Sequence, residues 1–263
     1  MKESNITVED YRTGGSYDIA YFSGIGKRDS QQDAAYLYAD DGMVFALLCD
    51  GMGGVEGGQR ASQTAIDSFA DYLHHQLNRK EGLLTGWVDH LKIVDDQVFR
   101  LRDNLGKREG PGTTLALAYI NEEKLYWLSV GDSRIYVSRG SELVQATTDH
   151  NYFILLNQKL SRGEITEAEV DAERKRGDAL ISFVGMGGLL LIDVNDSGFS
   201  LMKGDTVLIC SDGLYKSIPG ELLLRAIHAA SSASELSGFL QNAVLSADLS
   251  AQDNYTYLII RRK

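Results

Sequence analysis

The chain has 263 residues, with 26 Lys or Arg against 37 Asp or Glu, and a formal net charge of −11 at pH 7. This acidic balance argues against nucleic acid and anionic membranes as partners, because both carry negative charge. The longest apolar run, residues 43–49, is much shorter than the roughly 20 residues of a spanning helix, so we expect no membrane partner.

Apolar patterning runs from about Tyr17 to Ile260 without a linker or repeat, which predicts a single domain over residues 1–263. Cys49 and Cys210 both end apolar runs and are expected to be buried, reduced thiols, as is usual in a reducing compartment. Met1–Asn5 lacks the basic-then-apolar layout of a signal peptide. We therefore expect a soluble, cytoplasmic protein.

The first half of the chain predicts strands followed by helices. Apolar and β-branched runs indicate strands at residues 17–23, 34–39 and 43–49. Apolar residues at helical spacing then predict helices at about residues 57–75 and 83–105.

The second half returns to strands and then to helices. Strands are predicted at residues 114–120, 124–130 and 134–138, the first two forming a hairpin closed by Asn121-Glu122-Glu123. A polar helical stretch covers about 149–173, and further elements follow at 189–194 (strand), 206–210 (strand), 219–230 (helix), 233–247 (helix) and 255–260 (strand). This order differs from the regular alternation of a parallel α/β fold. It favours an α+β class, with antiparallel sheets and helices on their outer faces.

Aspartates in turn-forming contexts are the main functional signal: Asp33, Asp50, Asp132, Asp212 and Asp253. Asp50, Asp132 and Asp212 follow apolar strand-like runs, and Asp50 opens the glycine-rich segment Asp50-Gly51-Met52-Gly53-Gly54. A single Asp-Gly is most often only a turn. Several such strand ends brought together would form an oxygen-only cage, which hard divalent cations prefer.

The implied cofactor is Mg²⁺ or Mn²⁺, because the sequence has no Cys-x-x-Cys and no zinc-like histidine pair. Two such ions can lower the pKa of a shared water and direct it in line at phosphorus. Arg28, five residues before Asp33, is a candidate for binding the substrate phosphate through its guanidinium, although a solvated surface charge is the ordinary alternative.

A series of motifs resembles, in the same order, the metal-dependent protein phosphatases of the type 2C family, in their bacterial form. The resemblance spans about Gly24 to Ile260. It rests on Arg28-x-x-x-Gln32-Asp33, Asp50-Gly51-Met52-Gly53-Gly54, Gly112-Thr113-Thr114, Val130-Gly131-Asp132-Ser133-Arg134-x-Tyr136, Thr147-Thr148-Asp149-His150, Ser211-Asp212-Gly213-Leu214 and Asp253-Asn254-x-Thr256.

The resemblance implies a four-layer α-β-β-α sandwich, with two antiparallel sheets flanked by helix pairs and a metal site at one end. It implies hydrolysis of phosphoserine and phosphothreonine by metal-bound water, without a phosphoenzyme. Asp50 would bridge two ions, and Asp212 and Asp253 would complete the shell of the first. The Gly51 carbonyl would reach the second ion, with Gln32 or Asp33 nearby.

The same resemblance implies that Asp132 helps Asp212 to hold a weaker third ion, and that Arg28 binds the substrate phosphate. It also implies a mobile flap at about residues 149–188. The expected partners are phosphorylated proteins of a Ser/Thr kinase pathway, and we expect a monomer.

Two departures from the family pattern stand out. Gln32 is neutral where a carboxylate is frequent, and Met52 stands where animal and plant members usually have a histidine proposed as general acid. Met cannot donate a proton. Alternatives are a catalytically weak or inactive binding module with the same fold, and a phosphatase of small phosphometabolites. The Asp-x-Asp-x-Thr nucleophile motif that the second would need is absent.

Overall fold

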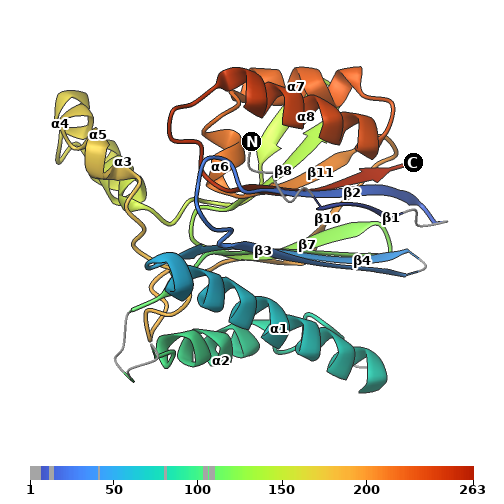
Figure 1. The fold of residues 1–263 in the computed structure, drawn as a ribbon, viewed down its shortest axis with the longest axis horizontal. Helices are drawn as coiled ribbons and strands as arrows, with labels where there is room; N and C mark the ends of the chain where they lie inside the picture. The colour runs from blue at the N-terminus through green and yellow to red at the C-terminus, as the bar shows by residue number, and fades with distance from the viewer. Residues whose placement is uncertain (1–6, 12–14, 41, 80–81, 103–105, 107–109) are drawn as a thin grey trace.

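The computed structural model describes residues 7–11, 15–40, 42–79, 82–102, 106 and 110–263. Two antiparallel sheets pack face to face, and a pair of helices covers the outer face of each (Figure 1). The predicted four-layer α-β-β-α sandwich is therefore confirmed.

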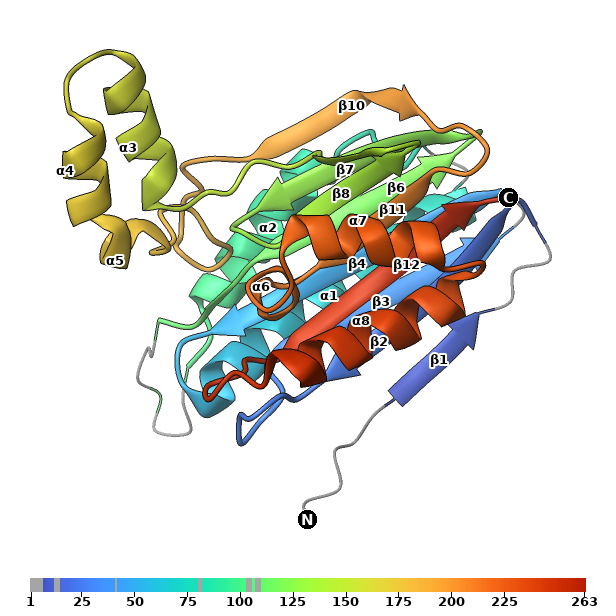
Figure 2. The same cartoon turned by 90° about the horizontal axis from the view of Figure 1, so that it is seen from above.

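The first sheet has the order β1-β2-β12-β11-β8-β9. Helices α7 (Gly220–Ala229) and α8 (Ala233–Ala247) lie across its outer face, as the view from above shows (Figure 2). The strands are β1 (Thr7–Tyr11), β2 (Tyr17–Gly24), β12 (Tyr255–Arg262), β11 (Thr206–Cys210), β8 (Arg134–Arg139) and β9 (Glu142–Gln145).

The second sheet has the order β10-β7-β6-β4-β3, with the short strand β5 paired to the end of β4. Helices α1 (Val55–Arg79) and α2 (Trp87–Phe99) cover its outer face. The strands are β10 (Asp193–Ser200), β7 (Lys124–Val130), β6 (Leu115–Asn121), β4 (Met43–Met52), β3 (Asp33–Asp40) and β5 (Gly112–Thr113).

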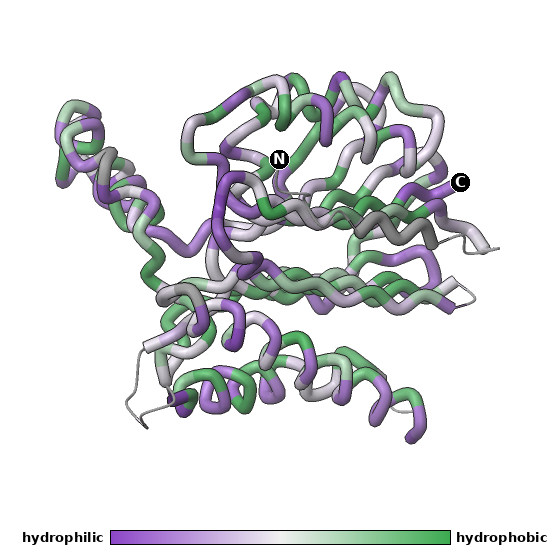
Figure 3. The backbone as a smooth tube through the Cα atoms, in the orientation of Figure 1, coloured by the Kyte–Doolittle hydropathy of each residue, from purple (hydrophilic) through white to green (hydrophobic). Residues whose placement is uncertain are grey.

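The inner strand β4, which lies between β6 and β3, shows why this part of the sequence is a continuous apolar run rather than an alternating one. Val44 and Leu48 point between the two sheets, whereas Phe45 and Leu47 pack towards α1 and α2. A strand that is buried on both faces needs apolar residues at every position. Figure 3 shows this apolar character along the strands of both layers.

Residues 149–188, which were expected to form a flap, project from one end of the sandwich (Figure 1); the name flap is kept for this segment. It contains α3 (Tyr152–Ser161), α4 (Glu167–Ala172) and α5 (Arg174–Gly177). At its start, the His150 N–H donates to the Gly131 carbonyl at 2.9 Å. At its end, Val184 exchanges two backbone hydrogen bonds of 2.9 Å with Thr113. The Gly185 N–H also donates to the buried carboxylate of Asp95 on α2, at 2.7 Å.

Most predicted elements form at or near their expected bounds. The predicted hairpin is confirmed, and Glu122 and Glu123 form its tight turn with φ of 48° and 64°. Strand β4 continues through Asp50 to Met52, beyond the predicted end at residue 49, because Gly51 pairs with Thr113. The helix predicted over residues 83–105 is shorter, and residues 103–105 lie outside the described residues.

The strand predicted at residues 189–194 is wrong in its position. The strand observed there is β10, which starts at Asp193 and pairs with β7 at the edge of the sheet. The apolar residues Leu189 and Ile192 instead pack against the core beneath α1 and α2. Strands β1 and β9 and the single-turn helix α6 (Asp212–Tyr215) were not predicted.

Two further expectations concern the compartment. Met1–Asn5, used for the expectation of no signal peptide, lies outside the described residues. Within the part of the chain that the structure describes, none of the helices combines the length and apolar character needed to cross a bilayer.

Candidate metal centre

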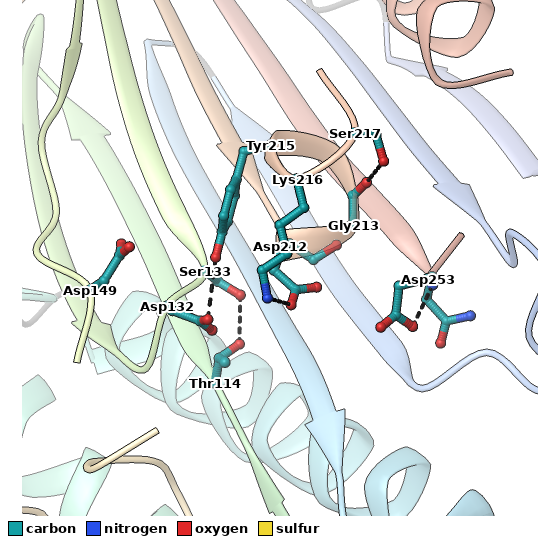
Figure 4. Close-up of polar contacts among 12 residues, drawn as sticks. Thr114, Asp132, Ser133, Asp149, Asp212, Gly213, Tyr215, Lys216, Ser217 and Asp253 are labelled. Atoms are coloured by element: carbon teal, nitrogen blue, oxygen red, sulfur yellow. Dashed lines mark hydrogen bonds and ion pairs between the residues drawn. The ribbon is translucent and has the colours of Figure 1, made fainter. Parts of the chain in front are cut away.

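A pocket of about 440 Å³ lies at the end of the sandwich nearest the flap. Every predicted site residue except Asp33 lines it: Arg28, Gln32, Asp50, Gly51, Asp132, Asp212 and Asp253. Figure 4 shows the carboxylates of Asp132, Asp212 and Asp253 arranged along this site. Residues that are distant in sequence therefore meet in one acidic cavity.

Asp50 is held in place through its backbone. Its N–H donates to Thr114 Oγ1 at 2.9 Å, and its carbonyl accepts from the Thr114 N–H and from Thr113 Oγ1, also at 2.9 Å. The Thr114 hydroxyl is itself bonded to Ser133 at 2.7 Å. These contacts fix the last residues of β4, so the Asp50 carboxylate enters the pocket from a rigid support.

Gly51 is required by close packing of the backbone. A Cβ atom at this position would collide with the carbonyl oxygen of Gly58 and would lie 2.7 Å from that of Gln32. The Gln32 side chain donates to the Gly54 carbonyl at 2.8 Å, and the backbone N–H of Gln32 donates to Asn254 Oδ1 at 2.8 Å. Gly51 and Gln32 thus both lie at the pocket wall.

Asp33 lies behind Asp50 rather than in the pocket. The two residues are paired across β3 and β4, and Asp33 is buried, with one carboxylate oxygen accepting from Ser211 Oγ at 2.8 Å. Its other oxygen has no hydrogen-bond partner. Burial raises the pKa of Asp33 to about 7, and the charge of Asp212 adds to this effect.

The carboxylates of Asp50 and Asp132 are also destabilised in their charged form. Burial, followed by the charges of Asp33 and Asp212, raises the pKa of Asp50 well above its usual range. Burial and the charge of Asp212 raise the pKa of Asp132 to about 7, against the opposing effect of Lys216. Repulsion of this kind is relieved when cations bind among the carboxylates.

Two cationic side chains bind the remaining carboxylates. Arg28 Nη2 lies 2.6 Å from Asp253 Oδ2, and Lys216 Nζ lies 2.7 Å from Asp212 Oδ2. Among the described residues, no three Asp, Glu, His or Cys side chains are clustered closely enough to hold an ion as they stand. In this arrangement, Arg28 and Lys216 supply part of the positive charge that the pocket requires.

The donor set nevertheless fits Mg²⁺ or Mn²⁺. The pocket presents the carboxylates of Asp50, Asp132, Asp212 and Asp253, while the only cysteines, Cys49 and Cys210, are buried and free. Hard divalent ions take oxygen ligands and keep several waters, so a roomy, acidic cavity suits them. The prediction that both thiols are buried is confirmed, and burial raises the pKa of each.

Sequence reasoning gave no role to Lys216 or Asn254. The Asn254 amide donates to the carbonyls of Ile25 and Ser30 at 2.9 and 3.0 Å, which fixes the loop that carries Arg28. Its position directly after Asp253 could have indicated that Asn254 takes part in the site. Lys216 follows Asp212 by four residues, a spacing that brings the two side chains together only once α6 is formed.

Comparison with known proteins identifies the family. The sequence profile of the family described as protein phosphatase 2C matches residues 23–251. Protein phosphatase PhpP of Streptococcus pneumoniae is 30% identical over 206 residues, which cover 77% of this chain and 81% of PhpP.

Solved structures of serine/threonine phosphatases share the fold of this chain. The Mycobacterium tuberculosis serine/threonine phosphatase PstP/Ppp is 25% identical with a TM-score of 0.71, over 94% of this chain and 99% of that one. A structure of the catalytic domain of PstP in complex with two manganese ions is also 25% identical, with a TM-score of 0.71 over 93% of this chain and 97% of that one. The family match and the shared fold show that the chain belongs to the protein phosphatase 2C family of metal-dependent serine/threonine phosphatases.

Proposed function

We propose that this chain hydrolyses phosphoserine and phosphothreonine in proteins by direct attack of water, in a reaction that needs Mg²⁺ or Mn²⁺. The observation that carries this proposal is the pocket in which Asp50, Asp212 and Asp253 meet beside Arg28. When bound, paired ions would supply an activated water and neutralise charge on the phosphate.

Asp50 would help to hold both ions, because its backbone is fixed and its carboxylate is close enough to the other acidic residues to feel their charges. Asp212 and Asp253 would complete the shell of one ion, while the Gly51 carbonyl and Gln32 would face the other. Asp33 would act from behind Asp50, because its charge contributes to the raised pKa of that carboxyl. This assignment follows the resemblance and the lining of the pocket.

Arg28 would bind the phosphate of the substrate. Its side chain is 58% exposed, and its partner Asp253 would bind an ion in place of Arg28. The guanidinium would then be free to form paired hydrogen bonds with phosphate oxygens. Met52 also lines the pocket, but its thioether cannot protonate the leaving alkoxide, so this side chain has no part in proton transfer.

We further propose that the substrates belong to a Ser/Thr kinase pathway in the cytoplasm, and that the protein works as a monomeric single domain. The flap contributes Asp178 and Leu180 to the pocket wall, which suits a role in contacting the protein substrate. The net charge of −11 supports the exclusion of nucleic acid and anionic membranes.

The test is release of phosphate from a phosphothreonine peptide by metal-stripped protein before and after Mn²⁺ is added. We expect turnover only with the ion, and almost none for Asp212→Asn under the same conditions. An inactive binding module would instead bind the phosphopeptide without releasing phosphate at any Mn²⁺ concentration. Turnover of the metal-stripped protein that equals that of the loaded protein would refute the metal requirement.

A further inference from the structure

Lys216 places a positive charge inside the acidic pocket. It directly follows α6, and its N–H donates to the Asp212 carbonyl at 2.9 Å, so its backbone position is fixed relative to that residue. Its side chain, 42% exposed, reaches back to bind Asp212 Oδ2 at 2.7 Å. The Lys216 ammonium is therefore paired with the Asp212 carboxylate, and both residues line the pocket.

Asp132 lies on the same side of the pocket. Figure 4 shows the Lys216 ammonium between the carboxylates of Asp132 and Asp212 in that view, and the charges of the two carboxylates act on each other. The Tyr215 hydroxyl donates to Asp132 Oδ2 at 3.3 Å, so Asp132 is oriented by the residue next to Lys216. Two carboxylates with one ammonium nearby resemble an ion site whose charge is already partly neutralised.

We propose that Lys216 competes with a divalent ion for the Asp132 and Asp212 side of the pocket, and thereby sets the affinity of the weakest-bound ion. The inference rests on the proposed function, because it requires a pocket that binds divalent ions. A unit positive charge a few ångströms from a divalent ion weakens its binding by at least about tenfold, even in water-like surroundings.

The flap offers the ammonium an alternative position. Asp178 lines the same pocket, and its charge also acts on Lys216. An ion that displaces Lys216 from Asp212 would leave the lysine beside this flap carboxylate rather than unpaired. Binding of the weakest ion is therefore coupled to the charge that the flap presents.

The experiment measures Mn²⁺ binding directly, by equilibrium dialysis with metal analysis, so that it does not depend on turnover. Lys216→Gln and Lys216→Met remove the charge, and Lys216→Arg keeps it. We expect both neutral variants to bind the weakest ion at least about tenfold more tightly than the wild type, and the arginine variant to match the wild type within about threefold. Circular dichroism verifies that each variant is folded.

Lys92→Gln is the matched control, because Lys92 forms a similar ion pair with Asp89, at 2.8 Å on the surface of α2. It should leave Mn²⁺ binding unchanged. Adding Asp132→Asn to Lys216→Gln should abolish the gain in affinity, since the gain requires the Asp132 carboxylate. Persistence of the gain in the double variant would overturn the inference.

Two negative results have different meanings. If the wild type binds Mn²⁺ and hydrolyses the phosphopeptide, but the neutral variants bind no more tightly, the competition proposed for Lys216 is refuted and the proposed function stands. If the wild type binds no Mn²⁺ at all, both proposals fail together.

Discussion

Replacing Asp33 by asparagine should make the metal-free protein less sensitive to pH. The carboxyl is buried, and its pKa is raised from 3.8 to about 7 by burial, with the charge of Asp212 adding to the effect. The folded state keeps this proton up to about pH 7, whereas the unfolded state loses it near the ordinary value. Because the folded state binds more protons in that window, its stability falls as the pH rises from about 4 to about 7.

The size of the effect follows from the shift. For a pKa that moves from 3.8 to about 7, the free energy of unfolding falls by about 2 kcal/mol between about pH 5.5 and about pH 7.5. Asp33→Asn removes the ionisable group but keeps an oxygen that accepts from Ser211 Oγ. The free energy of unfolding of the variant should therefore fall by about 2 kcal/mol less than that of the wild type between the same two pH values.

The assay is urea unfolding of metal-stripped wild type and Asp33→Asn at the two pH values, followed by circular dichroism. Asp89→Asn, which changes an exposed carboxylate of α2, is the control and should retain the pH dependence of the wild type. Equal losses of stability in the wild type and Asp33→Asn would show that Asp33 does not titrate between these pH values. The reasoning from its burial would then be wrong.

Three further predictions concern the pocket. Asp50→Asn and Asp212→Asn should each lower Mn²⁺-dependent turnover by at least about 100-fold while the protein stays folded, as measured with a phosphothreonine peptide. Arg28→Ala should raise KM by about tenfold with a smaller change in kcat, because it removes phosphate binding; a fall in kcat alone would contradict this. Thr114→Val should lower the free energy of unfolding by about 1 kcal/mol, because the partly buried Asp50 N–H loses its acceptor; a neutral result in urea unfolding would exclude that role.

The sequence predicted well those elements that carry a clear local signal, such as a continuous apolar run or a helix cap. Strand β11 is buried at all five positions, and both it and β7 have their predicted bounds. Helix α8 also starts and ends as predicted. Its start is marked by Ser232, whose hydroxyl accepts a hydrogen bond from the Glu235 N–H at 3.0 Å. Where local signals and tertiary packing agree, a single sequence is sufficient.

Strand β10 shows where this reasoning fails. It is a largely exposed edge strand with an irregular register, held by its pairing with β7 rather than by an apolar pattern of its own. The apolar residues just before it, which predicted a strand, fill space against the core in an irregular segment. An edge strand of this type depends on the neighbouring strand, which cannot be recognised from its own residues.

The pocket was predicted in its composition but not in its charge balance. The motifs identified the carboxylates, three of which, Asp50, Asp132 and Asp212, follow apolar strand-like runs. They did not indicate that Asp33 would lie behind Asp50, or that Lys216 would reach Asp212. The position of Asp33 depends on the pairing of β3 with β4, and the contact of Lys216 depends on the short helix α6, which has too few residues to give a periodic signal.

The flap is fastened to the sandwich at both of its ends, at Gly131 through His150 and at Asp95 and Thr113 through the segment that contains Val184. If this segment contacts the substrate as we propose, insertions, deletions or exchanges of residues between these anchor points would alter that contact surface while the backbone around Asp50 stays unchanged. Selectivity in such a protein can evolve, or be engineered by grafting, separately from its chemistry.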